Sequence, residues 1–174
     1  MIGADTIIVG LGGNVGGDDE VLARMQRIAG ALTAWGRVRA SRVYRSAAIG
    51  PAQADYLNAA VAIASTPAPT PRELLESLQE LERLEGRDRD RETRWGPRPI
   101  DLDVLLWGER VIDVDGPPRL RVPHERLAER RFALLPVIDL VGESLLLPGN
   151  GRRLGALVDS TANQRVELTA FAIE

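Results

Sequence analysis

Two aspartates, Asp101 and Asp103, carry the strongest chemical signal in the sequence, because they interrupt an apolar segment that runs from Ile100 to Trp107. Side chains at positions i and i+2 of a β-strand point to the same face, so both carboxylates project together while Leu102 enters the core. Two neighbouring carboxylates are costly unless cations bind them. Their spacing, roughly 6 to 7 Å along a strand, suits a pair of divalent ions. We predict two Mg²⁺ ions here, since Mg²⁺ accepts few carboxylates and completes its shell with water and phosphate oxygens. The alternative is a solvent-facing sheet edge that carries two charges.

The segment before this pair is rich in arginine, with five between residues 87 and 98: Arg87, Arg89, Arg91, Arg94 and Arg98. Guanidinium groups bind phosphate through paired hydrogen bonds, and a loop can bring several of them onto a polyphosphate that a metal already holds. The chain contains no lysine, which excludes a P-loop lysine and a Schiff-base lysine. The arginine loop, residues 87–99, therefore predicts a phosphate site, with a solvated charge run as the alternative.

A third candidate is His124, the only histidine, which follows Pro123 and lies near Arg119 and Arg130 in the sequence. A single histidine excludes a multi-histidine zinc site, and the absence of cysteine excludes thiolate nucleophiles and cysteine-bound zinc. Near these arginines we expect His124 to donate a hydrogen bond to phosphate. A lone structural histidine remains the alternative.

Aromatic and amide side chains suggest a site for a flat ring. Tyr56 and Asn58 alternate on one face of an apolar strand, and Phe132 is available elsewhere. A heteroaromatic ligand could stack between the two rings while Asn58 binds its edge, although ordinary core packing explains the rings equally well. The glycine-rich segment 10–17 lacks the third glycine of a dinucleotide loop, where Val15 stands, and is predicted to be a turn.

The elements that must position these residues follow a β-α-β-β-α-β order. Strands are expected at 5–11, 38–46, 56–65 and 100–107, with the second and third adjacent. A helix covers 21–32, and another begins at Thr70-Pro71, where Glu73 completes a capping box, and stops at Gly86. This order predicts an α+β ferredoxin-like sandwich that forms a single domain over 1–174. Additional C-terminal elements are a strand at 120–122, helices at 125–132 and 153–160, and an edge strand at 164–173.

Composition narrows the function classes. The chain has 174 residues and a net charge of −3, which argues against a basic nucleic-acid clamp and confines any anion site to one region. We find no signal-peptide pattern and no apolar run of about 20 residues, the length of a membrane span. We therefore expect a cytoplasmic protein that binds neither membrane nor nucleic acid.

Five segments together resemble the 6-hydroxymethyl-7,8-dihydropterin pyrophosphokinases of folate synthesis. These are Leu-Gly-Gly-Asn14, the run from Tyr44 to Pro51, Tyr56-Leu-Asn58-Ala-Ala-Val, Arg94-Trp95-Gly-Pro-Arg98-Pro-Ile-Asp101-Leu-Asp103, and Val122-Pro-His124 with Arg130 and Phe132. The resemblance spans residues 5 to about 140 in order, and its Trp-Gly-Pro-Arg-x-x-Asp-x-Asp segment is highly specific. It implies transfer of diphosphate from ATP to the pterin hydroxymethyl group, release of AMP, and two Mg²⁺ ions on Asp101 and Asp103.

The resemblance also implies a role for each matching residue. The positions implied in catalysis are Arg87, Arg98, Asp101 and Asp103. Those implied in ATP binding are Gln79, Glu82, Arg89, Arg94, Trp95, Arg119, His124 and Arg130. Those implied in pterin binding are Ala48, Ile49, Gly50, Tyr56, Asn58, Trp95 and Phe132. The family resemblance further suggests a monomer whose partners are the two small-molecule substrates.

The chain departs from the family pattern at a few positions. Gly13 replaces a serine, Ser46-Ala47-Ala48 replaces Thr-Pro-Pro, and Glu125 stands where tyrosine or proline is frequent. The arginine loop is one residue longer, which makes Arg91 an alternative to Arg89. Two other functions stay open: an enzyme of the same fold that uses another alcohol, and a non-catalytic small-molecule-binding module.

Overall fold

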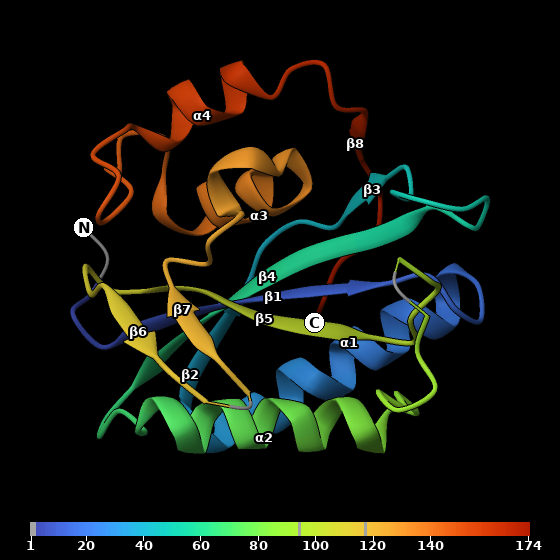
Figure 1. Cartoon of the computed structure of the whole chain (residues 1–174), viewed down its shortest axis with the longest axis horizontal. Coiled ribbons are helices and arrows are strands. Elements are labelled where there is room, and N and C mark those ends of the chain that lie inside the picture. The colour runs from blue at the N-terminus through green and yellow to red at the C-terminus, as the bar shows by residue number, and fades with distance from the viewer. Residues whose placement is uncertain (1–2, 94, 117) are drawn as a thin grey trace.

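The computed structural model describes residues 3–93, 95–116 and 118–174 and shows a central sheet between two layers of helices (Figure 1). Helices α1 and α2 cover one face of the sheet, and α3 and α4 cover the other. The helices are α1 (Asp18–Leu32), α2 (Pro71–Leu84), α3 (Arg131–Val141) and α4 (Leu154–Ser160). The strands are β1 (Thr6–Gly13), β2 (Gly36–Ala40), β3 (Tyr44–Ser46), β4 (Tyr56–Ser65), β5 (Asp101–Trp107), β6 (Ile112–Val114), β7 (Leu120–Val122) and β8 (Val166–Leu168). The predicted α+β class is confirmed.

The main sheet has the order β5-β1-β4-β3-β8, and β2 also pairs with β4. All of these pairs are antiparallel, while β6 and β7 form a separate hairpin. The strand predicted at 38–46 is thus two strands, both of which lie beside β4 as expected. They separate at Ser41, whose hydroxyl accepts a 2.9 Å hydrogen bond from Ala60 N in place of a ladder carbonyl.

Both predicted helices of the first half are confirmed. In α2 the Thr70 hydroxyl accepts from Glu73 N at 3.2 Å, and the Glu73 carboxylate accepts from Thr70 N at 2.8 Å. This reciprocal cap satisfies donors that a helix N-terminus otherwise leaves unpaired. Leu74 and Leu78 are buried, and the same helical face then buries Glu82 beneath β5.

In the C-terminal third, the strand expected at 120–122 is confirmed as β7 and the helix expected at 153–160 as α4, but two other elements differ from the prediction. The helix expected at 125–132 is wrong, because Leu127–Glu129 forms a short 3-10 helix and α3 begins only at Arg131. His124 prevents a helix from starting at residue 125. Its Nδ1 accepts a hydrogen bond from Arg126 N at 3.1 Å, and its carbonyl accepts one from Leu127 N, which forms a turn. The expected edge strand at 164–173 is limited to β8, which pairs with β3.

Two apolar cores lie on opposite faces of the sheet. The first packs beneath α1 and α2, and the second packs beneath α3 and α4. On the second face, β1 contributes Ile8 to the core. The next two residues of β1 on this face are Gly10 and Gly12, so this end of the strand carries no side chains there. This change leaves room for a cavity. Within the described ranges, no helix is long and apolar enough to cross a membrane.

Candidate active site

A pocket of about 400 Å³ lies between the sheet and the start of α3. Its floor is β1, where Gly12 is registered opposite Asn58 on β4 and Asp101 on β5, and Gly10 is opposite Asp103. A Cβ atom at Gly10 would lie 2.9 Å from a methyl carbon of Leu105, so any side chain there would require Leu105 to move. The turn predicted at 10–17 is therefore wrong for its first four residues, which belong to β1.

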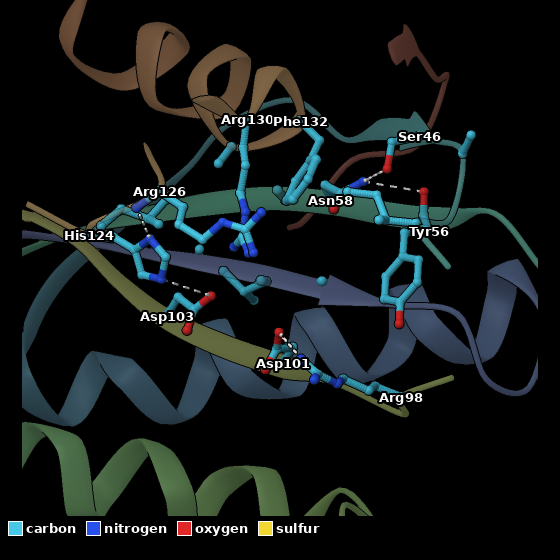
Figure 2. A pocket seen from close by; sticks show the side chains of 18 of the residues that line it. Ser46, Tyr56, Asn58, Arg98, Asp101, Asp103, His124, Arg126, Arg130 and Phe132 are labelled. Carbon is cyan, nitrogen blue, oxygen red and sulfur yellow. Dashed lines mark hydrogen bonds and ion pairs between the residues drawn. The ribbon is translucent and has the colours of Figure 1, made fainter. Parts of the chain in front are cut away.

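The aspartate pair lies at one end of this pocket, with both side chains directed into it (Figure 2). Arg98 Nη1 donates to Asp101 at 2.7 Å, and Arg87 donates to the same carboxylate. Burial alone would raise the pKa of Asp101, but these two guanidinium groups outweigh it and hold the pKa below its usual value. Asp103 lies 3.8 Å from His124 Nε2, and burial together with the Asp101 charge raises its pKa. The two carboxylates thus differ in their surroundings.

Arg87 is itself buried beneath the pocket, only 5% exposed. Its guanidinium donates to Glu82, Glu92 and Asp101, and Leu102 N donates to Glu82 at 2.8 Å. Burial acts to lower the pKa of Arg87, and the three carboxylates more than reverse that effect. Burial raises the pKa of Glu82, which the arginine charges oppose. Arg87 and Glu82 therefore anchor the arginine loop to α2 and β5 in this structure.

The other end of the pocket is apolar and aromatic. Tyr56 and Asn58 extend from β4, and Phe132 extends from α3 (Figure 2). Asn58 Nδ2 donates to Ser46 Oγ at 3.0 Å and to Tyr56 O at 3.3 Å. A Cβ atom at Gly12 would lie 3.5 Å from Asn58 Oδ1, so this oxygen faces the open glycine floor. Asn58 therefore presents an acceptor to the pocket.

Asn14 connects the two loops that border the pocket. Its Nδ2 donates to Gln53 Oε1 at 3.0 Å and to Ala54 O at 2.9 Å, while its Oδ1 accepts from Arg98 N at 2.9 Å. Gln53 Nε2 in turn donates to Trp95 O at 2.7 Å. Trp95 adopts a φ of 64°, a left-handed conformation that is uncommon outside glycine and that these contacts help to fix. The loop between β3 and β4, residues 47–55, is thus coupled to the arginine loop.

The structure brings together about half of the residues singled out in the sequence. Those that line the pocket are Ile49, Tyr56, Asn58, Trp95, Arg98, Asp101, Asp103, His124, Arg130 and Phe132. Those that do not are Ala48, Gly50, Gln79, Glu82, Arg87, Arg89 and Arg119. Arg89 binds Glu82, and Arg119 binds Asp113 on the β6-β7 hairpin. Arg94 lies outside the described residues.

Sequence reasoning missed Arg126 and the two floor glycines, all of which line the pocket. The i, i+2 spacing of Gly10 and Gly12 within an apolar strand was a usable signal for a floor without side chains. Arg126, two residues after His124 and four before Arg130, falls within the helix expected at 125–132, and the sequence does not predict where its side chain points.

Comparisons with known proteins identify relatives of this chain. The family model described as 7,8-dihydro-6-hydroxymethylpterin-pyrophosphokinase (HPPK) matches residues 8–142. The chain is 41% identical to a 2-amino-4-hydroxy-6-hydroxymethyldihydropteridine pyrophosphokinase of Pseudomonas aeruginosa over 131 residues, which is 75% of each chain. It is 33% identical to the Haemophilus influenzae protein of that name over 162 residues, 92% of this chain and 96% of that one.

Solved structures show a similar fold. A structure of Plasmodium falciparum HPPK-DHPS superposes with a TM-score of 0.69 at 11% identity, over 91% of this chain and 41% of that chain. This chain therefore spans less than half of that longer protein. The family match covers most of the chain, from the first strand through α3. The chain belongs to the 7,8-dihydro-6-hydroxymethylpterin-pyrophosphokinase family.

Proposed function

We propose that this chain transfers a diphosphoryl group from ATP to the hydroxymethyl oxygen of 6-hydroxymethyl-7,8-dihydropterin, as an enzyme of folate synthesis. One observation carries the proposal. A single pocket holds the Asp101 and Asp103 carboxylates with Arg98 at one end, and Tyr56, Asn58 and other ring-binding groups at the other. The two ends suit a metal-bound polyphosphate and a flat heterocycle, respectively. The Pseudomonas aeruginosa and Haemophilus influenzae relatives are both named as pyrophosphokinases of hydroxymethyldihydropteridine.

The proposal includes two Mg²⁺ ions at the aspartate pair. The described residues contain no cluster of three or more His, Cys, Asp or Glu side chains that could hold a metal ion by themselves. Asp101 and Asp103 fit Mg²⁺ better than a metal that needs a full protein cage, because Mg²⁺ is usually held by one or two carboxylates plus substrate phosphates. Bound there, Mg²⁺ would supply neutralising charge for the triphosphate.

On the phosphate side, we expect Arg98, His124 and Arg130 to bind and orient the triphosphate. The pterin hydroxyl oxygen forms a bond to the β-phosphorus, the bond from that phosphorus to the α,β-bridging oxygen breaks, and AMP leaves with the electron pair. The hydroxyl proton passes to solvent, and we assign no side chain as its acceptor. The arginine charges stabilise the negative charge that develops on AMP.

On the ring side, Tyr56 and Phe132 would stack on the pterin, and Asn58 Oδ1 would accept a hydrogen bond from its edge. Ser46 supports this role, because it holds the Asn58 amide nitrogen and so orients the oxygen. Ile49 and the backbone of Ala48 and Gly50 would contact the ring from the adjoining loop. Ile49 is 53% exposed without a ligand, which leaves it accessible to one.

The remaining family-implied positions stay predictions that require loop movement. Arg87, Arg89 and Glu82 are bound to one another and to neighbouring groups, so a role toward ATP requires these ion pairs to exchange. Gln79 on α2 and Arg119 before β7 do not line the pocket, so their roles toward ATP stay predictions. We expect Trp95 to cover the reaction and exclude water once the loop closes.

We also infer that the fold is a ferredoxin-like sandwich, that residues 1–174 form one domain, and that the protein acts as a cytoplasmic monomer. The antiparallel order β5-β1-β4-β2 for the β-α-β-β-α-β unit supports the first inference. The monomeric state is what the family resemblance implies. Cell fractionation and sedimentation would test compartment and oligomeric state.

The decisive experiment is AMP release from ATP and Mg²⁺, with and without the hydroxymethyldihydropterin, with the product weighed by mass spectrometry. Pterin-dependent AMP and a pterin diphosphate are the expected result. Release of ADP would mean γ-phosphoryl transfer and a different reaction. Nucleotide turnover that occurs only with a different alcohol would mean that the pterin is not the acceptor. Folded protein without any turnover would favour a non-catalytic binding module.

A further inference from the structure

Arg126 is a pocket residue to which neither the motifs nor the proposed mechanism assigns a role. It lies between β7 and α3, in the turn that carries His124, and its side chain lines the pocket (Figure 2). The 3.1 Å hydrogen bond from Arg126 N to His124 Nδ1 fixes this turn. Arg126 and His124 are therefore presented to the same cavity by one tight backbone segment.

The Arg126 guanidinium has little to neutralise it. Its one ion pair within the described residues is a 3.9 Å contact with Glu129, whose side chain is 71% exposed. An exposed pair at that distance contributes little. The same guanidinium also lies over the Trp95 ring, whose centroid is 5.5 Å from the Arg126 Cζ atom, within the range of a cation–π contact.

A second cation faces the same space. Arg130 points from the start of α3 toward the aspartate end of the pocket (Figure 2), and its Nε is buried without a hydrogen-bond partner among the described residues. Burial and the nearby Arg126 charge lower the pKa of Arg130. By contrast, Arg98 is already bound to Asp101. Arg126 and Arg130 are thus the pocket cations whose charge is least satisfied without a ligand.

We propose that Arg126 is a further nucleotide-binding residue, which binds a phosphate oxygen of the triphosphate together with Arg130, across the pocket from Asp101 and Asp103. Because the same guanidinium lies over Trp95, phosphate binding also repositions the tryptophan and so the arginine loop. Arg126 then contacts both the phosphate and Trp95 of the arginine loop. The inference rests on the proposed function, since it takes ATP as the occupant.

Direct binding measurements test the first part. Calorimetric titration with Mg²⁺ and α,β-methylene-ATP, in which the scissile bridge cannot break, reports nucleotide affinity without turnover. We expect Arg126→Gln to raise Kd about tenfold or more, the scale for losing a charge-assisted hydrogen bond. Pterin affinity, measured without nucleotide, should change less than about twofold by the same reasoning.

Arg121→Gln is the matched control, because it removes the same charge nearby. Arg121 lies on β7, does not line the pocket, and pairs with Asp113 and Glu125. Its nucleotide Kd should stay within about twofold of the unmodified chain. Equal losses in Arg121→Gln and Arg126→Gln would overturn the inference in favour of a general charge effect. Thermal unfolding of both variants establishes that they are folded.

Fluorine NMR of protein labelled with 5-fluorotryptophan tests the second part, with the Trp95 resonance assigned from Trp95→Phe. Addition of the nucleotide analogue should shift this resonance in the unmodified chain and in Arg121→Gln. In saturated Arg126→Gln the shift should be lost or greatly reduced, whereas a shift of full size would overturn the coupling to Trp95.

The outcomes separate this inference from the function on which it rests. If the unmodified chain binds the analogue and makes the pterin diphosphate while Arg126→Gln binds equally well, the inference alone fails. If the unmodified chain binds no nucleotide, both fail. Arg126→Lys keeps the charge without the planar fork, and we expect an affinity between those of Arg126→Gln and the unmodified chain.

Discussion

The two ends of the pocket differ in how their side chains are occupied before any ligand arrives. At the phosphate end, Asp101 is bound by Arg87 and Arg98, and Glu82 and Glu92 hold Arg87 in turn. At the ring end, Asn58 is oriented by Ser46 and presents its oxygen to an open glycine floor. Asp101 and its arginine partners are charged and paired with one another, Arg126 and Arg130 are poorly neutralised, and the ring end is neutral with its amide already oriented.

This difference indicates different costs of binding. A pterin must only displace water from an apolar, oriented site, whereas binding of the triphosphate with its metal ions must exchange the existing ion pairs of Asp101 for new ones. Exchange of charged partners in a partly buried site can be nearly neutral, but removal of one partner leaves a charge unpaired at high cost. We expect substitutions at the phosphate end to affect turnover most and those at the ring end to affect substrate affinity.

The largest effect should follow from Asp103→Asn. Loss of one carboxylate from the proposed metal pair should reduce kcat for AMP release by at least about 100-fold, since bound metal supplies several kcal/mol of charge stabilisation. Steady-state assays across a Mg²⁺ titration would measure this. Asp113→Asn on the exposed β6-β7 hairpin is the control and should retain activity. Near-normal turnover in Asp103→Asn would remove the carboxylate from the mechanism.

A smaller effect is expected at the ring end. Phe132→Ala removes one proposed stacking partner and should raise the pterin KM about tenfold while kcat changes little. The other phenylalanine, Phe171, packs against the opposite core, so Phe171→Ala should lower stability without changing KM. Unchanged pterin affinity in Phe132→Ala would argue against stacking.

The connection between the two ends can be weakened through Asn14. Asn14→Ala removes hydrogen bonds to Gln53, Ala54 and Arg98 N and leaves those groups without partners, at a cost of about 1–3 kcal/mol in the free energy of unfolding. Urea denaturation would measure the loss. Because both loops lose a shared anchor, the KM values for both substrates should rise. A change confined to one substrate would show that the loops act independently.

The smallest expected effect is on stability in the absence of metal, where substitution of the two aspartates should change the free energy of unfolding in opposite directions. The pKa of Asp101 is lowered, so its contribution to stability is present above the ordinary aspartate value and is lost as pH falls through the lowered one. The pKa of Asp103 is raised, so its contribution is present at low pH and is lost as pH rises. At pH 7 with a chelator, Asp101→Asn should therefore destabilise the protein and Asp103→Asn should stabilise it.

Denaturation curves from pH 3 to pH 8 would test this difference. The effect of each substitution should fade as the medium becomes acidic, because the wild-type carboxyl is then protonated as well. Destabilisation by both substitutions at neutral pH would contradict the different surroundings described for the pair.

Local pattern in the sequence determined much of this protein. Alternation placed Asp101 and Asp103 on one face of a buried strand, and the capping box at Thr70 located the start of α2. Both depend on neighbours within a few residues, whose geometry is set by the backbone period. A local contact also explains why the helix expected at 125–132 is wrong. The His124 side chain accepts a hydrogen bond from the backbone N–H of Arg126, which favours a turn over a helix start.

Only the tertiary structure decided which distant groups meet. Strand pairing placed Gly12 between Asp101 and Asn58, which turned a segment predicted as a turn into the pocket floor. Packing of α2 beneath β5 bound Arg87 to Glu82 instead of leaving it in a free loop. The direction of Arg126 followed from a turn whose position depends on α3. Contacts between residues far apart in the chain have no local period, so the sequence alone could suggest the chemistry and not its arrangement.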